Sequence, residues 1–219
     1  MLKRFATGLI GLTLLVAALS PASAEKRVAL VIGNSAYKNT TPLKNPSNDA
    51  VDMAEALRAL DFEVIDGTDL RKRDMMKRIR AFAEKLDGAD VGLFFYAGHG
   101  LQVDGRNFLA PVDAALKSDT DLDFEAIELN LVLKQLERNA RLSIVFLDAC
   151  RDNPLARNLV VAGRSLAVGR GLAQVEKAVG MMIAFMTRAL SASVITGAGE
   201  YAPMPPVLAP VSPSPTRLW

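Results

Sequence analysis

The stretch VGLFFYAGHG, residues 91–100, contains an apolar run followed by a short polar motif. The run at 91–97 is too short for an ordinary helix, and its continuous apolar character is typical of a buried strand. The GHG motif that follows holds His99, the one histidine among the 219 residues. A second stretch, LSIVFLDAC at 142–150, has the same form and ends at Cys150, the one cysteine. Two predicted strands therefore each lead into a residue whose side chain can act in catalysis.

Working outward from these stretches, the same kinds of pattern recur along the chain. Short apolar runs predict further strands at 27–33, 62–65 and 181–186. Apolar residues at helical spacing predict helices at 46–60, 71–86 and 127–139. A hairpin is predicted over 101–109, around the Asp104 and Gly105 turn. Alternating strands and helices predict an α/β fold with an open, mostly parallel sheet.

Composition excludes several classes of protein. Half of the residues are hydrophobic and 23% are charged, which excludes a mainly disordered chain. The formal net charge of +2 gives no reason to expect nucleic-acid binding. One cysteine excludes an intramolecular disulfide framework and a Cys-rich zinc site, and one histidine adds too few ligands for a redox or metal protein. We expect no resident metal or cofactor.

Residues 1–24 have the pattern of a bacterial secretory signal peptide: a basic start, a short apolar run and small residues at the end. We expect cleavage between Ala24 and Glu25, and hence a periplasmic or secreted protein without a stable membrane anchor. An uncleaved anchor is the alternative. Without Lys3 and Arg4, the 26 basic residues become 24, which equals the number of acidic residues.

The remaining chain divides into two parts. Residues 25–187 are predicted to form one domain. Residues 188–219 hold six of the eleven prolines and show no strand or helix period, so we expect a disordered tail. The sequence does not indicate an oligomeric state.

His99 and Cys150 follow two strands of one sheet and should therefore lie at the same edge. If the strands are neighbours, their ends are on the order of 5–10 Å apart, which suits a Cys–His dyad. A thiolate is a strong nucleophile, and an imidazole can take and return its proton. The backbone N–H groups of Gly100 and Cys150 could stabilise an oxyanion, and the glycines beside His99 would let a substrate backbone approach. The alternatives are a small core cysteine and a structural loop histidine.

Five segments carry a resemblance to a known family: ALVIGNSAY at 29–37, NPSNDA at 45–50, FFYAGHG at 94–100, LAPVDA at 109–114 and FLDACRDNP at 146–154. Together they resemble the caspase-like cysteine peptidases, especially the bacterial metacaspase-type branch. The resemblance implies a caspase-like three-layer α/β sandwich. It also implies that His99 and Cys150 are the catalytic dyad and that the Gly100 N–H helps to form the oxyanion hole.

The same resemblance implies a substrate class. Asp148 matches an acidic residue of the pocket that binds the side chain before the cleaved bond (P1), and Asp49 resembles its second acidic partner. Two carboxylates there favour Arg or Lys at P1. The expected activity is a cysteine-type endopeptidase acting on peptides or proteins with basic P1. Asp148 could instead accept loop N–H groups, and Asp49 could simply be a first-turn helix acid.

Some metacaspases require calcium, and four acidic residues lie in the corresponding region: Asp113, Asp119, Asp121 and Asp123. Acidic loops are more often just solvated. After Met186 the sequence departs from the family, so the final strand or strands of the sheet are expected to be missing. The alternative to an active peptidase is therefore a catalytically impaired peptide-binding module or a truncated, non-functional fragment. Self-processing is a further expectation, at the loop arginines Arg157, Arg164 and Arg170.

Overall fold

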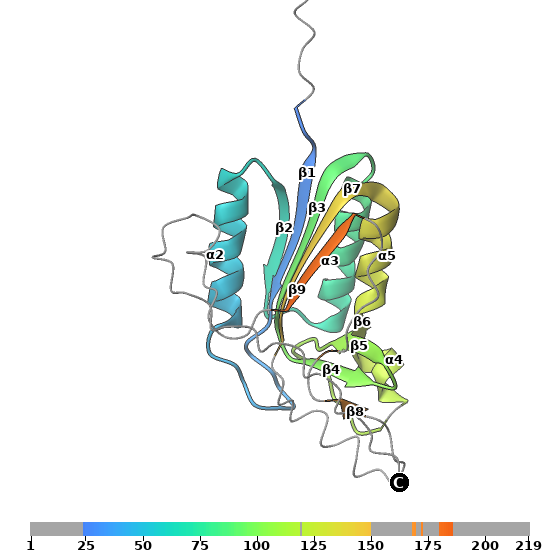
Figure 1. The fold of residues 1–219 in the computed structure, drawn as a ribbon. Coiled ribbons are helices and arrows are strands. Elements are labelled where there is room, and N and C mark those ends of the chain that lie inside the picture. Colours follow the sequence, from blue (N-terminus) through green and yellow to red (C-terminus); the bar gives the residue numbers. More distant parts are fainter. Residues whose placement is uncertain (1–23, 119, 150–167, 170–171, 173–179, 186–219) are drawn as a thin grey trace, which may run out of the picture.

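The computed structural model describes residues 24–118, 120–149, 168–169, 172 and 180–185 (Figure 1). Residues 1–23 of the predicted signal peptide and the whole predicted tail lie outside these residues, as do Cys150, Asp119 and the three arginines named for self-processing. No helix within the described part of the chain is long and apolar enough to cross a membrane.

Five parallel strands form the central sheet in the order β2-β1-β3-β7-β9. Their bounds are β1 Arg27–Gly33, β2 Glu63–Thr68, β3 Ala89–Gly98, β7 Ala140–Ala149 and β9 Met181–Phe185. The chain leaves β1 for β2 on one side and then crosses to β3 on the other side. Strand order therefore reverses between β1 and β3, and the carboxyl edge at such a reversal is where α/β sheets form their sites.

Helices cover both faces of this sheet (Figure 1). Helix α2, Pro46–Ala59, packs on one face against β1, β2 and β3. Helices α3, Lys72–Lys85, and α5, Leu129–Asn139, lie side by side on the other face. The result is the predicted three-layer α/β sandwich.

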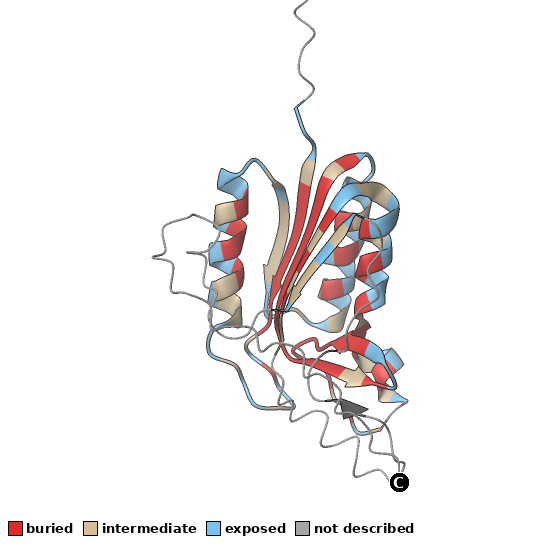
Figure 2. Cartoon of the chain, viewed as in Figure 1, coloured by how far each residue is buried: buried red, intermediate tan, exposed pale blue. Residues whose placement is uncertain are grey.

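Burial on both faces explains why β1 and β3 read as continuous apolar runs (Figure 2). Between α2 and the sheet, one core contains Met53, Leu57 and Phe95. A larger core lies between α3, α5 and the sheet, with Phe82 and Leu136 among its fully buried members. The helix side chains in these cores recur at helical spacing, so each helix presents one apolar face to the sheet.

A small second sheet follows the carboxyl edge of the first, in the order β6-β5-β4-β8. Its strands are β4 Gly100–Val103, β5 Arg106–Leu109, β6 Ile127–Glu128 and β8 Val168–Gly169, and helix α4 spans Asp121–Glu125. The predicted hairpin is confirmed: β4 and β5 pair antiparallel around Asp104 (φ 49°) and Gly105 (φ 77°), as a tight two-residue turn requires. Helix α4 and strands β6 and β8 were not predicted.

Several strand bounds differ from the prediction. Strands β3 and β7 are longer than the apolar runs at 91–97 and 142–147, and they end directly before residues 99 and 150. Strand β2 extends past its predicted end at residue 65, through Asp66 and Gly67, and the chain turns at Asp69 (φ 51°). Within the described residues β9 pairs with β7 alone. Because the chain after Phe185 lies outside those residues, the expected loss of the last strand stays a prediction.

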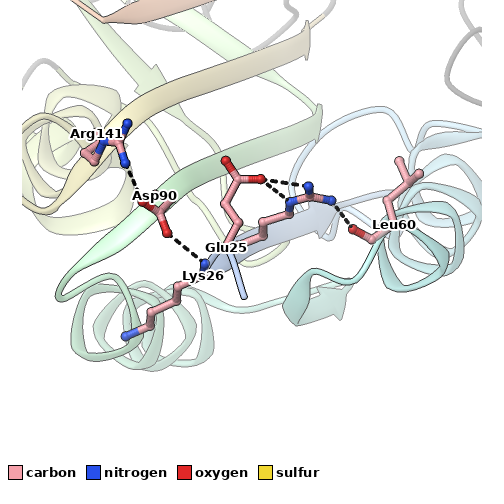
Figure 3. Close-up of polar contacts among 6 residues, drawn as sticks. Glu25, Lys26, Leu60, Asp90 and Arg141 are labelled. Carbon is pink, nitrogen blue, oxygen red and sulfur yellow. Dashed lines mark hydrogen bonds and ion pairs between the residues drawn. The ribbon is translucent and has the colours of Figure 1, made fainter. Parts of the chain in front are cut away.

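The amino edge of the sheet, opposite the carboxyl edge, is held by Asp90 (Figure 3). One carboxylate oxygen of Asp90 accepts the Lys26 backbone N–H at 3.0 Å, and the other pairs with Arg141 at 2.8 Å. Arg27 pairs with Glu25 and donates to the Leu60 carbonyl at the end of α2. These contacts join the starts of β1, β3 and β7, so the sheet is tied together at the end remote from His99.

Candidate active site

Strands β3 and β7 are neighbours, as a Cys–His dyad requires. Their parallel register pairs Ala97 with Asp148 and Gly98 with Ala149. His99 therefore follows one member of the last pair, and in the sequence Cys150 follows the other. Cys150 itself lies outside the described residues, so its thiol is not placed.

The His99 imidazole is buried at the carboxyl end of β3, with 2% of the residue exposed. Its Nε2 lies 2.9 Å from the backbone carbonyl oxygen of Thr41, in the loop between β1 and α2. Because a carbonyl can only accept a hydrogen bond, this contact assigns the ring hydrogen to Nε2. Nδ1 is buried and has no hydrogen-bond partner among the described residues. The site thus holds a neutral imidazole whose Nδ1 lone pair is available to take a proton.

The pKa of His99 supports this protonation state. Burial lowers the pKa below its ordinary value, and the Thr41 carbonyl opposes this shift more weakly. An imidazole that stays neutral at physiological pH can act as a general base.

Two tyrosines bracket the His99 backbone, and neither was among the predicted site residues. Tyr37, in the loop after β1, accepts the His99 backbone N–H at 2.7 Å. Its ring also lies against the imidazole, with centroids 4.4 Å apart. Tyr96 donates its hydroxyl to the His99 carbonyl at 2.7 Å. Tyr96 lies within the predicted strand at 91–97 and Tyr37 in the loop after the strand at 27–33, and neither position indicates a contact with His99.

The glycines beside His99 are needed for packing within the protein. A Cβ atom at Gly98 would lie 2.6 Å from the Tyr37 hydroxyl and 2.7 Å from the Tyr96 hydroxyl. A Cβ atom at Gly100 would lie 3.0 Å from Ala149 Cβ. Protein atoms therefore occupy the space that these glycines leave, so internal packing is one reason for the GHG motif. Close approach of a substrate backbone stays a prediction.

The structure brings Asp49 and Asp148 together. Asp148 is half-buried at the end of β7, and its pKa is raised first by burial and second by the negative charge of Asp49. Asp49 lies in the first turn of α2, and its pKa is raised by burial and then by Asp52. Burial and like charge are the causes of both shifts, and Asp49 is also a first-turn acid of α2, as the simpler interpretation of this residue expects. Two carboxylates held this way favour a bound cation.

The described acidic residues of the predicted calcium region, Asp113, Asp121 and Asp123, contact different protein partners. Asp113 accepts the Lys72 N–H at 3.0 Å, at the start of α3. Asp121 accepts the N–H groups of residues 117 and 118. Asp123 pairs with Arg106 at 3.3 Å. Among the residues whose positions are described, no three His, Cys, Asp or Glu side chains gather as metal ligands.

Comparison with known proteins identifies the family of this chain. The family model described as the caspase domain, of the C14 peptidases, matches residues 26–198. The chain therefore belongs to the caspase-domain family of cysteine peptidases.

Two curated relatives share part of the chain. The human mucosa-associated lymphoid tissue lymphoma translocation protein 1 is 35% identical over 130 residues, which are 58% of this chain and 15% of that protein. Its mouse homologue matches with the same identity and coverage. The chain thus spans about 15% of the length of these relatives. Among solved structures, one from Geobacter sulfurreducens matches with a TM-score of 0.47 and 20% identity, covering 60% of this chain and 53% of that one.

Proposed function

We propose that this protein is an exported cysteine endopeptidase that cleaves peptide bonds after Arg or Lys. The observation that carries the proposal is the buried, neutral His99. Its Nδ1, which has no hydrogen-bond partner among the described residues, lies at the same sheet edge as the Asp49 and Asp148 carboxylates. Membership of the caspase-domain family supports the coarser class, a cysteine peptidase acting on proteins or peptides.

The proposed reaction uses the chain's own residues. The Cys150 thiol transfers its proton to His99 Nδ1, and the thiolate attacks the scissile carbonyl carbon. The N–H groups of Gly100 and Cys150 stabilise the resulting oxyanion. Protonated His99 then gives its proton to the departing amine, leaving an acyl thioester on Cys150. Water, deprotonated by His99, hydrolyses this thioester and returns the free thiol.

Throughout this cycle, Thr41 keeps the imidazole in one orientation. The Nε2–H donated to the Thr41 carbonyl leaves Nδ1 as the proton-accepting atom, and the carbonyl favours the imidazolium formed after proton transfer. This stabilisation is needed only while the histidine is charged, so it lowers the barrier more than it strengthens substrate binding.

The specificity experiment compares two substrates of nearly equal shape. Fluorogenic peptides with Arg at P1 are assayed beside the same peptides with citrulline, which replaces the guanidinium by a neutral urea group. We expect Asp148→Asn and Asp49→Asn to lower kcat/KM for Arg peptides by about tenfold or more, since hydrogen bonds to charged groups contribute about 1.5–3 kcal/mol. Citrulline peptides should be cleaved slowly by all three proteins. Equal loss on both substrates would contradict a carboxylate pocket.

The catalytic claim is tested with Cys150→Ala, His99→Ala and a thiol-directed peptide inhibitor, each with Ca²⁺ or a chelator present. A wild-type protein that neither hydrolyses Arg or Lys peptides nor reacts at Cys150 is not a peptidase. Binding of basic peptides without turnover would instead indicate the impaired binding module. A chelator-sensitive rate would establish the calcium dependence.

Export and self-processing have their own measurements. Amino-terminal sequencing of protein recovered from the periplasm should begin at Glu25 if the signal peptide is cleaved as proposed. Fragments that end at Arg157, Arg164 or Arg170 should be absent from Cys150→Ala protein, and their persistence there would assign them to another protease.

A further inference from the structure

We propose that Tyr37 is a positioning residue for His99, and that its hydroxyl, together with that of Tyr96, fixes the backbone from which the imidazole projects. The inference rests on the proposed function in one respect, because it takes His99 to be the base of the dyad. The structural part of the claim stands without it.

The two hydroxyls hold His99 from opposite sides of its backbone. Tyr37 accepts the His99 N–H at 2.7 Å, and Tyr96 donates to the His99 carbonyl at 2.7 Å. Tyr37 donates in turn to the Ala110 carbonyl at 3.3 Å. Both tyrosines are buried, with 5% and 0% of the residue exposed, so water does not readily replace either contact.

The Tyr37 and Tyr96 contacts differ in whether another protein group can satisfy the same backbone atom of His99. The His99 carbonyl also accepts the Ala110 N–H at 2.9 Å, so it keeps a partner without Tyr96. Among the described residues, Tyr37 is the acceptor for the His99 N–H. A buried N–H without an acceptor is unfavourable, so removal of the Tyr37 hydroxyl should disturb His99 more than removal of the Tyr96 hydroxyl.

Tyr37 also joins His99 to the loop that orients its side chain. The same loop between β1 and α2 carries Thr41, whose carbonyl accepts the imidazole Nε2–H. This loop is held against residues 112–114, because Lys38 N–H donates to the Val112 carbonyl and the Asn39 side chain donates to the Asp113 carbonyl. The Tyr37 hydroxyl therefore fixes the position of the His99 backbone relative to the Thr41 carbonyl, which determines the tautomer of the imidazole.

Gly98 is required by this arrangement. A Cβ atom there would lie 2.6 Å and 2.7 Å from the two tyrosine hydroxyls, so any side chain would displace them. The first glycine of the GHG motif and the two tyrosines thus form one structural unit around His99.

The experiment uses the fact that the chain has one histidine. Protein labelled with ¹³C,¹⁵N-histidine and purified with a tag free of histidine gives one imidazole and one histidine backbone amide by NMR. In the wild type we expect the Nε2–H tautomer and a titration midpoint below that of exposed histidine. In Tyr37→Phe, which keeps the ring but loses the hydroxyl, we expect an increased share of the other tautomer. The midpoint should move up, because an imidazole displaced with its backbone is less buried.

Kinetics provide the second readout. Tyr37→Phe should lower kcat for Arg peptides on the order of tenfold, with KM within about twofold, as expected for loss of one buried hydrogen bond. Tyr96→Phe should show the same changes to a smaller extent. Ile79→Val, a core change in α3 that costs about 0.5–1.5 kcal/mol of stability, is the control and should leave the imidazole signals unchanged.

The outcomes separate this inference from the proposed function. A folded Tyr37→Phe protein with wild-type imidazole shifts, midpoint and kcat overturns the positioning role, whether or not the wild type is a peptidase. An inactive wild type whose imidazole still responds to Tyr37→Phe overturns the peptidase proposal and keeps the positioning role. If Tyr37→Phe does not fold, the wild-type His99 backbone amide decides: strong protection from hydrogen exchange supports the hydroxyl contact, and rapid exchange contradicts it.

Discussion

At the scale of single residues, burial shifts the acidity of the three candidate side chains in the direction that their proposed roles need. For His99, burial lowers the pKa and leaves a neutral base. For Asp148 and Asp49, burial and neighbouring negative charge raise the pKa and leave carboxylates that are poorly solvated. A guanidinium or ammonium group of a substrate would offset the lost solvation of these carboxylates. The poor solvation of the two carboxylates in the free protein therefore favours binding of a basic substrate.

The Asp148 shift predicts how stability depends on pH. The pKa of Asp148 in the fold is above the ordinary value of 3.8, so its stabilising effect is present only while it is protonated and is lost as the pH rises through the folded-state pKa. Asp148→Asn should therefore raise Tm at pH 7, and this advantage should shrink as the pH falls toward 4. Thermal unfolding from pH 4 to 8 measures it.

Asp104→Asn is the matched control for this experiment, because it makes the same chemical change at an exposed hairpin turn. It is not expected to raise Tm. A constant difference between Asp148→Asn and wild type across the pH range would show that packing, and not ionisation, is responsible.

The sequence predicts His99 from its chemistry and its place after a strand, and it predicts Asp49 and Asp148 from the family resemblance. Thr41 could not be found in this way, since it contributes a backbone carbonyl that every residue type possesses. Tyr37 reads as an ordinary loop residue and Tyr96 as a member of an apolar strand. Their role depends on the contacts that their hydroxyls make with the backbone N–H and carbonyl of His99 in three dimensions.

At the scale of elements, the junction between β1 and α2 controls where Asp49 lies. Gly33 ends β1, and a Cβ atom there would collide with the Pro46 carbonyl oxygen and come within 2.5 Å of Ala50 Cβ. The first turn of α2 can lie this close to the sheet only because residue 33 has no side chain. Asp49 is carried in that same turn.

Gly33→Ala should therefore displace the start of α2. We expect a loss of about 1–3 kcal/mol in the free energy of unfolding, as in other overpacked sites, together with a raised KM for Arg peptides. Denaturant unfolding and peptide kinetics measure the two effects. Gly88→Ala is the comparison: its φ of +68° makes it strained, but no atom lies within 4 Å of the new Cβ, so its KM should stay near wild type.

Element prediction succeeded where periodicity was long and failed where it was short. The amphipathic helix α3 and the buried strands β1 and β3 follow from patterns of seven residues or more. Helix α4, with five residues, and the two-residue strands β6 and β8 depend on pairing and packing with distant segments, which leave little local signal. Strand β7 is longer than predicted because its first residue, Ala140, pairs with Ala89 of β3. Arg141, which follows, is polar, so the apolar pattern did not indicate this part of the strand.

At the scale of the whole molecule, the candidate site residues and the contacts of Asp90 that stabilise the sheet lie at opposite edges of the sheet. The carboxyl edge carries His99, Asp49 and Asp148, whereas Asp90 joins the strands at the amino edge (Figure 3). Within the described part of the chain, the partners of the Asp90 carboxylate are Lys26 and Arg141, and neither is a candidate site residue. Stability and activity should therefore separate when the amino edge is changed.

Asp90→Ala should lower the free energy of unfolding by about 1–2 kcal/mol, because it removes a hydrogen bond to a charged group and a largely exposed ion pair. At temperatures where the variant stays folded, kcat/KM for Arg peptides should match wild type. A large loss of activity in fully folded Asp90→Ala protein would mean that the two edges are coupled.

The parallel register of β3 and β7 has a consequence for changes in chain length. These strands are paired from Ala89 and Ala140 to Gly98 and Ala149. Their carboxyl ends therefore stay adjacent when the length of the chain between them changes. The exposed turn at Asp104 and Gly105 lies within that intervening stretch. Insertions or deletions there can accumulate during evolution, or a reporter peptide can be placed there, while the spacing of the two strand ends that lead into His99 and Cys150 is preserved.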